Sequence, residues 1–94
     1  MTSYHWNIEK NIKLKDERGI GFEDVVEAIY NGGLLDVVEH PNQEKYPQQN
    51  IYVVHALGYV YLVPYVTDGE RLFLKTIIPS RKAKKLYLEN KNVR

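Results

Sequence analysis

Two basic residues, Lys75 and Arg81, stand where a strand is expected to give way to a helix. Residues 72–78 are apolar and rich in β-formers, which predicts a buried strand. Pro79 is expected to end that strand, and Ser80 to cap a helix. Arg81 would then lie just inside a helix N-terminus, where the guanidinium and the amide donors both favour phosphate oxygens. Lys75 would share a strand face with Phe73 and Ile77, which puts an amine on an apolar stripe.

This pairing of arginine and lysine suits chemistry on a phosphodiester. RNA carries its own nucleophile, the 2′-OH, so a protein that holds the phosphate in line and neutralises developing charge accelerates cleavage without a metal. The charge distribution supports a polyanion ligand. Residues 71–94 carry eight Lys or Arg and one acid, whereas the preceding residues carry five and eleven. The formal net charge of +1 therefore hides an acidic body with a basic end.

The expected C-terminal helix has two unlike sides. Projected at about 100° per residue, it places Ala83, Leu86 and Tyr87 on one side for packing. Its basic residues take the other side, together with Leu88, which we interpret as a contact for a protein partner. A solvated amphipathic helix explains the basic side equally well.

Other chemistry has little support in the sequence. The three histidines, His5, His40 and His55, are far apart and form no zinc-ligand motif, so neither a metal nor a cofactor is expected. His55 is the only strand histidine, and a structural role in the sheet is the simpler interpretation. The absence of cysteine excludes disulfides and thiolate sites and fits a cytoplasmic protein. No apolar run approaches the ~20 residues of a membrane span, and no signal peptide is visible.

The remaining pattern predicts one α+β domain over residues 1–94. Asn7 is expected to cap a helix to about Glu17, and Gly19 to end it. Gly21 would begin a second helix that ends at residues 31–33. Strands are expected at 34–39, 50–56 and 59–66, with a loop at 40–49, a bulge or edge at Pro64 and a turn at 68–69. Two N-terminal helices and a C-terminal helix would thus cover one face of a twisted antiparallel sheet of three to five strands.

Several short motifs resemble the BrnT family of toxins. Trp6-Asn7 followed by Lys10 resembles its opening W-D-x-x-K segment. The run from Arg18 to Val25, RGIGFEDV, resembles its K-H-G-I-S-F-E-E-A joint, and IIPSR at 77–81 followed by Tyr87 resembles its closing I-S-A-R…Y segment. The chain departs from the family at Glu17, where the family has Lys, and at Arg18, where it has His.

The resemblance implies a RelE/ParE-like fold and the toxin half of a type II toxin–antitoxin pair. Such a toxin is a metal-independent ribonuclease that arrests translation, acts on free or ribosome-bound RNA, and is neutralised by a ribbon-helix-helix antitoxin like BrnA. Operator DNA would be bound only through the antitoxin complex. By position, the resemblance assigns the catalytic site to Arg81, Lys75, Arg18 and Tyr87. The basic residues Lys15, Lys82, Lys84 and Lys85 are then expected to bind RNA.

Three other functions fit the same residues. A toxin on this scaffold can poison another target, such as DNA gyrase. A non-catalytic nucleic-acid or protein-binding module would bind in a salt-dependent way without cleaving. The departures at Glu17 and Arg18 also fit an inert toxin that still binds its antitoxin.

Overall fold

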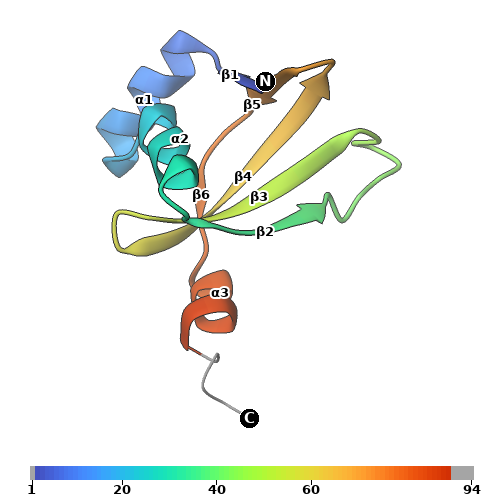
Figure 1. The fold of residues 1–94 in the computed structure, drawn as a ribbon. Coiled ribbons are helices and arrows are strands. Elements are labelled where there is room, and N and C mark those ends of the chain that lie inside the picture. Colours follow the sequence, from blue (N-terminus) through green and yellow to red (C-terminus); the bar gives the residue numbers. More distant parts are fainter. Residues whose placement is uncertain (1, 90–94) are drawn as a thin grey trace.

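The protein is a six-stranded sheet with helices on both faces, in a computed structural model that describes residues 2–89 (Figure 1). The α+β prediction is confirmed. Helices α1 (Ile8–Arg18) and α2 (Phe22–Tyr30) lie on one face, and the short α3 (Arg81–Lys84) with the π-helical turn η1 (Lys85–Glu89) lies on the other. The strands are β1 (Ser3–His5), β2 (Leu34–Glu39), β3 (Gln49–Ala56), β4 (Tyr59–Asp68), β5 (Arg71–Leu74) and β6 (Ile78–Pro79). Their order is β1-β5-β4-β3-β2, and β6 also pairs with β4.

The sheet differs from the expected one in two ways. It is mixed rather than antiparallel, because the edge strand β1 is parallel to β5, and it has six strands because the segment expected as one strand at 72–78 is divided into β5 and β6. The C-terminal helix also does not share a face with α1 and α2. Alternation along β4 explains this: Val63 packs toward α1 and α2, whereas Val60 packs toward α3. Since both faces of the central strands are apolar, both faces need a cover.

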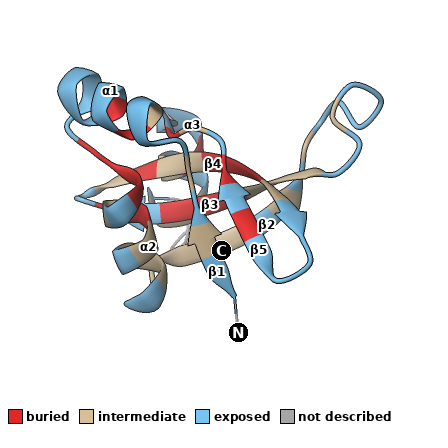
Figure 2. Cartoon of the chain, turned by 90° about the horizontal axis from the view of Figure 1, so that it is seen from above, coloured by how far each residue is buried: buried red, intermediate tan, exposed pale blue. Residues whose placement is uncertain are grey.

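The larger core lies between the sheet and the α1–α2 pair. Ile20, Phe22 and Val25 are fully buried there, and Trp6 stacks on Phe22 with ring centroids 5.6 Å apart. Figure 2 shows this burial as a band along the middle of β3 and β4. The aromatic pair fixes the point where the chain leaves β1 and enters α1.

The strand expected at residues 72–78 is broken. Two residues of β4, one of them Pro64, lie opposite three residues of the neighbouring segment, 75–77. Pro64 has no N–H to offer the ladder, and only its carbonyl is used, accepting from Lys75 N at 2.8 Å. The predicted irregularity at Pro64 is therefore confirmed as a bulge in the facing strand.

The bulge changes which way the side chains point. Ile77 is completely buried with the α1–α2 core, whereas Lys75 is exposed. The expectation that these two residues share a face is wrong, because the extra residue inverts the alternation. Pro79 also does not end the strand but belongs to β6, which restarts the pairing after the bulge.

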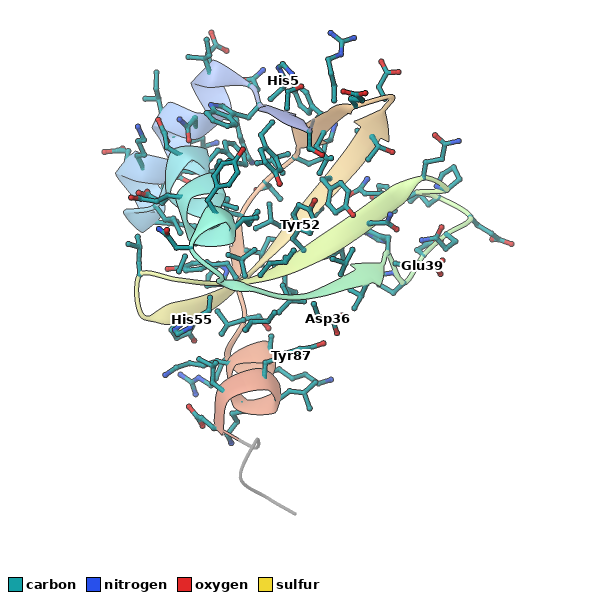
Figure 3. The ribbon with its side chains drawn as sticks, in the orientation of Figure 1. His5, Asp36, Glu39, Tyr52, His55 and Tyr87 are labelled. Carbon is teal, nitrogen blue, oxygen red and sulfur yellow. The ribbon has the colours of Figure 1, made fainter. Side chains whose placement is uncertain are left out.

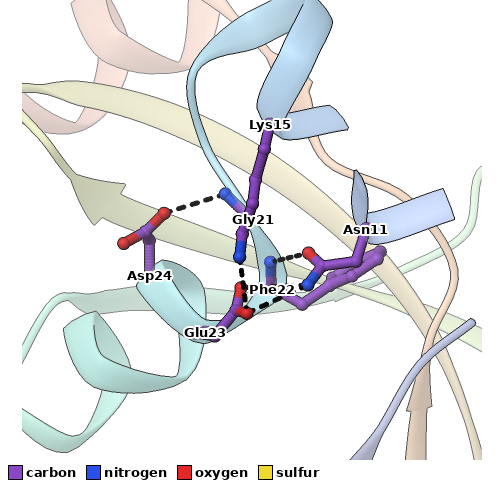
Figure 4. Close-up of polar contacts among 6 residues, drawn as sticks. All are labelled: Asn11, Lys15, Gly21, Phe22, Glu23 and Asp24. Carbon is purple, nitrogen blue, oxygen red and sulfur yellow. Dashed lines mark hydrogen bonds and ion pairs between the residues drawn. The ribbon is translucent and has the colours of Figure 1, made fainter. Parts of the chain in front are cut away.

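The joint between α1 and α2 is held by polar contacts (Figure 4). Gly19 has the left-handed conformation expected at a helix end, with φ of 71°. Gly21 precedes α2, and a Cβ there would lie 2.5 Å from both Glu23 Oε1 and Lys15 Cε. Since a serine-type cap has no room, Asn11 of α1 supplies the missing acceptor, and its Oδ1 accepts from Phe22 N at 2.7 Å.

This joint should weaken in acid. The Lys15 ammonium donates to Glu23 at 2.8 Å and the Asn11 amide adds two more bonds, so the pKa of Glu23 lies below its ordinary value of 4.5. A carboxyl group whose pKa is lower in the folded state stabilises the fold at pH values above its unfolded-state pKa. This contribution is lost as the pH falls through the folded-state pKa. We expect the free energy of unfolding, measured in urea between pH 7 and about pH 3, to fall less steeply for Glu23→Gln than for the unmodified chain. Glu44→Gln, on the exposed 40–48 loop, should follow the unmodified slope instead.

The β3–β4 hairpin contains a correctable strain. Leu57 and Gly58 form its two-residue turn with φ of 51° and 77°, which is the type I′ pattern. Leucine pays a steric cost in this region, and its side chain is 65% exposed, so little packing compensates. Leu57→Asn should raise the free energy of unfolding by about 1 kcal/mol and the melting temperature by ~4–8 °C. Leu57→Ala is the control, because alanine keeps the strain. A gain for alanine equal to that for asparagine would contradict this account.

Candidate nucleic-acid interface

Two neighbouring hollows on the surface share one aromatic side chain, Phe73. The first, the histidine hollow, has a volume of about 420 Å³ and is lined by His5, Val66, Asp68, Arg71 and Phe73. The second, the lysine hollow, is shallower, with a volume of about 550 Å³. It is lined by Asn7, Glu9, Lys10, Lys13, Phe73 and Lys75. Both fall in the size range of ligand pockets.

Strand pairing builds the histidine hollow. His5 of β1 and Val66 of β4 are the direct neighbours of Phe73 in the sheet, so the three side chains form a row across one face. Asp68 and Arg71 flank the β4–β5 turn, with Nη2 of Arg71 3.5 Å from Oδ2 of Asp68. That ion pair is highly exposed and contributes little to stability, so both groups are free to meet a ligand.

His5 is the residue that sequence reasoning missed. It lies in a three-residue strand, and only the parallel pairing with β5 brings it beside Phe73. Nε2 of His5 lies 3.0 Å from Ser3 Oγ, and Nδ1 takes part in no hydrogen bond among the described residues. An imidazole nitrogen can accept or donate a proton in general acid–base catalysis, which is the chemical function that the basic residues lack.

The lysine hollow joins α1 to the bulge. The N-cap of α1 is Asn7, whose side chain accepts from Lys10 N at 2.9 Å. Because Asn7 and Phe73 line the same hollow, the helix begins beside this ring. Lys10 and Lys13 are one turn apart and reach the same hollow as Lys75. The Lys75 amine lies 5.4 Å from the centre of the Phe73 ring.

The positive charge of the three lysines exceeds the negative charge in this hollow. Within residues 2–89, none of the ion pairs includes Lys10, Lys13 or Lys75, and the only acid in the hollow is Glu9. A concave surface with three ammonium groups and one carboxylate concentrates anions. The lysine hollow is therefore suited to a phosphate group.

Arg18 and Lys15 have structural partners. The guanidinium of Arg18 donates to the carbonyl oxygen of Ile77, which ties the end of α1 to the bulge. Lys15 is bound to Glu23 in the helix joint. Neither residue lines either hollow, although both belong to the helix whose other end carries Lys10 and Lys13.

Arg81 and its neighbours lie away from the two hollows. Ser80 caps α3 as predicted, its hydroxyl accepting from Ala83 N at 3.0 Å. However, α3 has only four residues and packs on the opposite face from α1, at the other end of the molecule from β1 (Figure 1). Neither hollow includes Arg81, Lys82, Lys84 or Lys85. The structure thus brings Lys75 together with lysines of α1 rather than with Arg81.

Tyr87 anchors the C-terminal segment. Its hydroxyl donates to Oδ2 of Asp36 at 2.6 Å, a bond that raises the pKa of Tyr87 and lowers the pKa of Asp36. Figure 3 shows this contact at the opposite end of the molecule from His5. Tyr87, which belongs to η1, is therefore a packing residue that contacts β2.

The expected sides of the C-terminal helix need one correction. Leu88 packs beside Ala83 and Tyr87 against the sheet, whereas Leu86 is 58% exposed. The expected projection assumed 3.6 residues per turn, but residues 85–89 form a π-helical turn, which is wider. Leu86 rather than Leu88 is thus the apolar side chain available to a partner. Lys91 and Arg94, counted in the basic end, lie outside the described residues.

Comparison of the chain with protein families, curated proteins and solved structures found no match. The resemblance to BrnT toxins therefore depends on the short motifs alone. Within residues 2–89, no helix has the length and apolar character needed to span a membrane. The same residues contain no group of three or more His, Asp or Glu side chains placed to hold a metal ion.

Proposed function

We propose that this protein is an RNA-cleaving toxin of a type II toxin–antitoxin pair, acting in the cytoplasm and held in check by a ribbon-helix-helix antitoxin. The motif resemblance suggests this function. The observation that carries it is the lysine hollow, where Lys10, Lys13 and Lys75 meet beside an aromatic ring and next to His5.

The two hollows supply the groups that metal-independent cleavage requires. A scissile phosphate in the lysine hollow would meet ammonium groups that neutralise the charge developing on its oxygens. The 2′-oxygen attacks phosphorus, the P–O5′ bond breaks, and a 2′,3′-cyclic phosphate forms. His5 would take the 2′-OH proton, while the leaving oxygen takes a proton from water and the imidazolium returns its proton to solvent.

Arg81 keeps a separate place in this proposal. It is the residue that the motif resemblance assigns to catalysis, but it stands at the start of α3 outside both hollows. Comparing Lys75→Ala with Arg81→Ala therefore locates the site. If Arg81→Ala loses cleavage and Lys75→Ala does not, the active site lies at α3.

The deciding experiment is cleavage of a defined single-stranded RNA by the purified protein in the presence of EDTA. The matched control is the same oligonucleotide with 2′-deoxy sugars, which offers no internal nucleophile. We expect RNA fragments with cyclic phosphate ends, intact deoxy strand, and growth arrest when the protein is expressed in a bacterium. Salt-dependent binding without fragments would instead indicate a non-catalytic module, and inhibition of DNA gyrase would indicate the other toxin class.

A further inference from the structure

The histidine hollow contains groups that have no role in the proposed proton transfer to His5. It combines an exposed aromatic ring with a carboxylate and a guanidinium at its rim, and the proposed cleavage uses neither Phe73, Asp68 nor Arg71. An aromatic wall with a few polar groups at its edge is the usual arrangement for a flat heteroaromatic ligand.

The geometry points to a nucleobase. We propose that the histidine hollow holds the base adjoining the phosphate in the lysine hollow, stacked on Phe73, so that the two hollows together bind one nucleotide of a single strand. The inference rests on the proposed function in taking RNA as the ligand, but it concerns binding and not cleavage.

Phe73 is placed to divide base from phosphate. It is 38% exposed and lines both hollows, and the Lys75 amine lies 5.4 Å from the ring centre on the lysine side. A nucleotide joins its phosphate and its base through one sugar, so the groups that bind them must be adjacent. The Lys75 ammonium and the Phe73 ring are adjacent, with the phosphate bound by the first and the base stacked on the second.

The frame around Phe73 is rigid, which favours stacking. Its main chain is paired on both sides, with His5 in β1 and with Val66 in β4. A ring held on a central strand loses little conformational freedom when a base covers it. At the rim, the Asp68 carboxylate accepts from base N–H groups, and the Arg71 guanidinium donates to base oxygens and ring nitrogens.

The test compares Phe73→Leu with Phe73→Trp. Leucine keeps an apolar side chain on β5 but removes the ring, whereas tryptophan keeps a stacking surface. Binding is measured by anisotropy with an uncleavable 2′-deoxy or 2′-methoxy strand, and stacking by quenching of a single 2-aminopurine base. We expect Phe73→Leu to bind about 10-fold more weakly and to lose the quenching, and Phe73→Trp to retain both.

The outcomes separate this inference from the proposed function. If the unmodified protein quenches the reporter base but cuts no RNA, the nucleobase site stands and the nuclease proposal falls. If RNA is cut but Phe73→Leu binds and quenches as the unmodified protein does, the nucleobase site is overturned. Circular dichroism and melting of each variant establish that it is folded, and a second variant, Arg71→Gln, should weaken binding while the ring and the fold are unchanged.

Discussion

Lys75→Ala is expected to lower the rate of RNA cleavage about 100-fold and to relieve growth arrest on expression. Lys75 is the one basic residue that the sequence places in the site and the structure places in the lysine hollow. Lys75 continues the strand alternation of Phe73, so its side chain is exposed, and its amine lies 5.4 Å from the centre of the Phe73 ring, which lines both hollows. Removal of a charge directed at the scissile phosphate should act mainly on the chemical step. Single-turnover cleavage at saturating protein measures that step directly.

Two further variants make the experiment specific. Lys75→Arg retains the charge and should keep a substantial part of the activity. Lys45→Ala removes a lysine from the 40–48 loop, outside both hollows, and should cleave at the unmodified rate. Because Lys75 is exposed, its loss should leave the melting temperature within a few degrees. Full activity of Lys75→Ala in a folded protein would rule out the lysine hollow as the catalytic site.

Asn11→Ala is expected to lower the free energy of unfolding by about 2–3 kcal/mol and the melting temperature by ~10 °C or more. Asn11 is 6% exposed and makes contacts in two directions. Its amide nitrogen donates to both oxygens of Glu23, at 3.0 and 3.1 Å, and its oxygen accepts from Phe22 N. Alanine would leave the first N–H of α2 without a partner in a buried place. The better helix propensity of alanine offsets only ~0.7 kcal/mol.

Thermal and urea unfolding measure this loss. Glu17→Ala, an exposed change in the same helix, is the control and should stay within ~0.5 kcal/mol of the unmodified protein. Coupling is tested by a double-mutant cycle with Glu23→Gln, which should give a smaller loss for Asn11→Ala in the variant background. A loss below ~0.5 kcal/mol for Asn11→Ala alone would show that the helix joint does not depend on this cap.

The helical hairpin could be predicted because its signals are local. Asn7 caps α1, Gly19 ends it in a left-handed conformation, and Gly21 precedes α2, each as expected from its neighbours in the chain. The β3–β4 hairpin and the loop at 40–48 follow from similar short-range patterns. These features need no knowledge of distant residues, so periodicity and turn residues were enough.

The candidate site could be predicted only in part, since distant pairing decides it. Lys75 was recognised as a lysine that shares a face with Phe73, but the α1 lysines that complete its hollow are distant in the sequence. His5 acquires its neighbours from β5, 66 or more residues later in the chain, and no local pattern announces a parallel pairing of that span. Arg81 was expected beside Lys75 from their closeness in sequence, yet Arg81 begins α3 at the other end of the molecule from β1 and lines neither hollow (Figure 1).

The parallel pairing of β1 with β5 also has a consequence during synthesis of the protein. As the nascent chain leaves the ribosome, β1 and α1 emerge first but find no partner for His5 or for Lys10 until residues 71–75 have followed them. Neither hollow exists in a partly synthesised chain. If the protein cleaves RNA as proposed, a nascent chain is therefore inactive until residues 71–75 have been synthesised and have paired with β1.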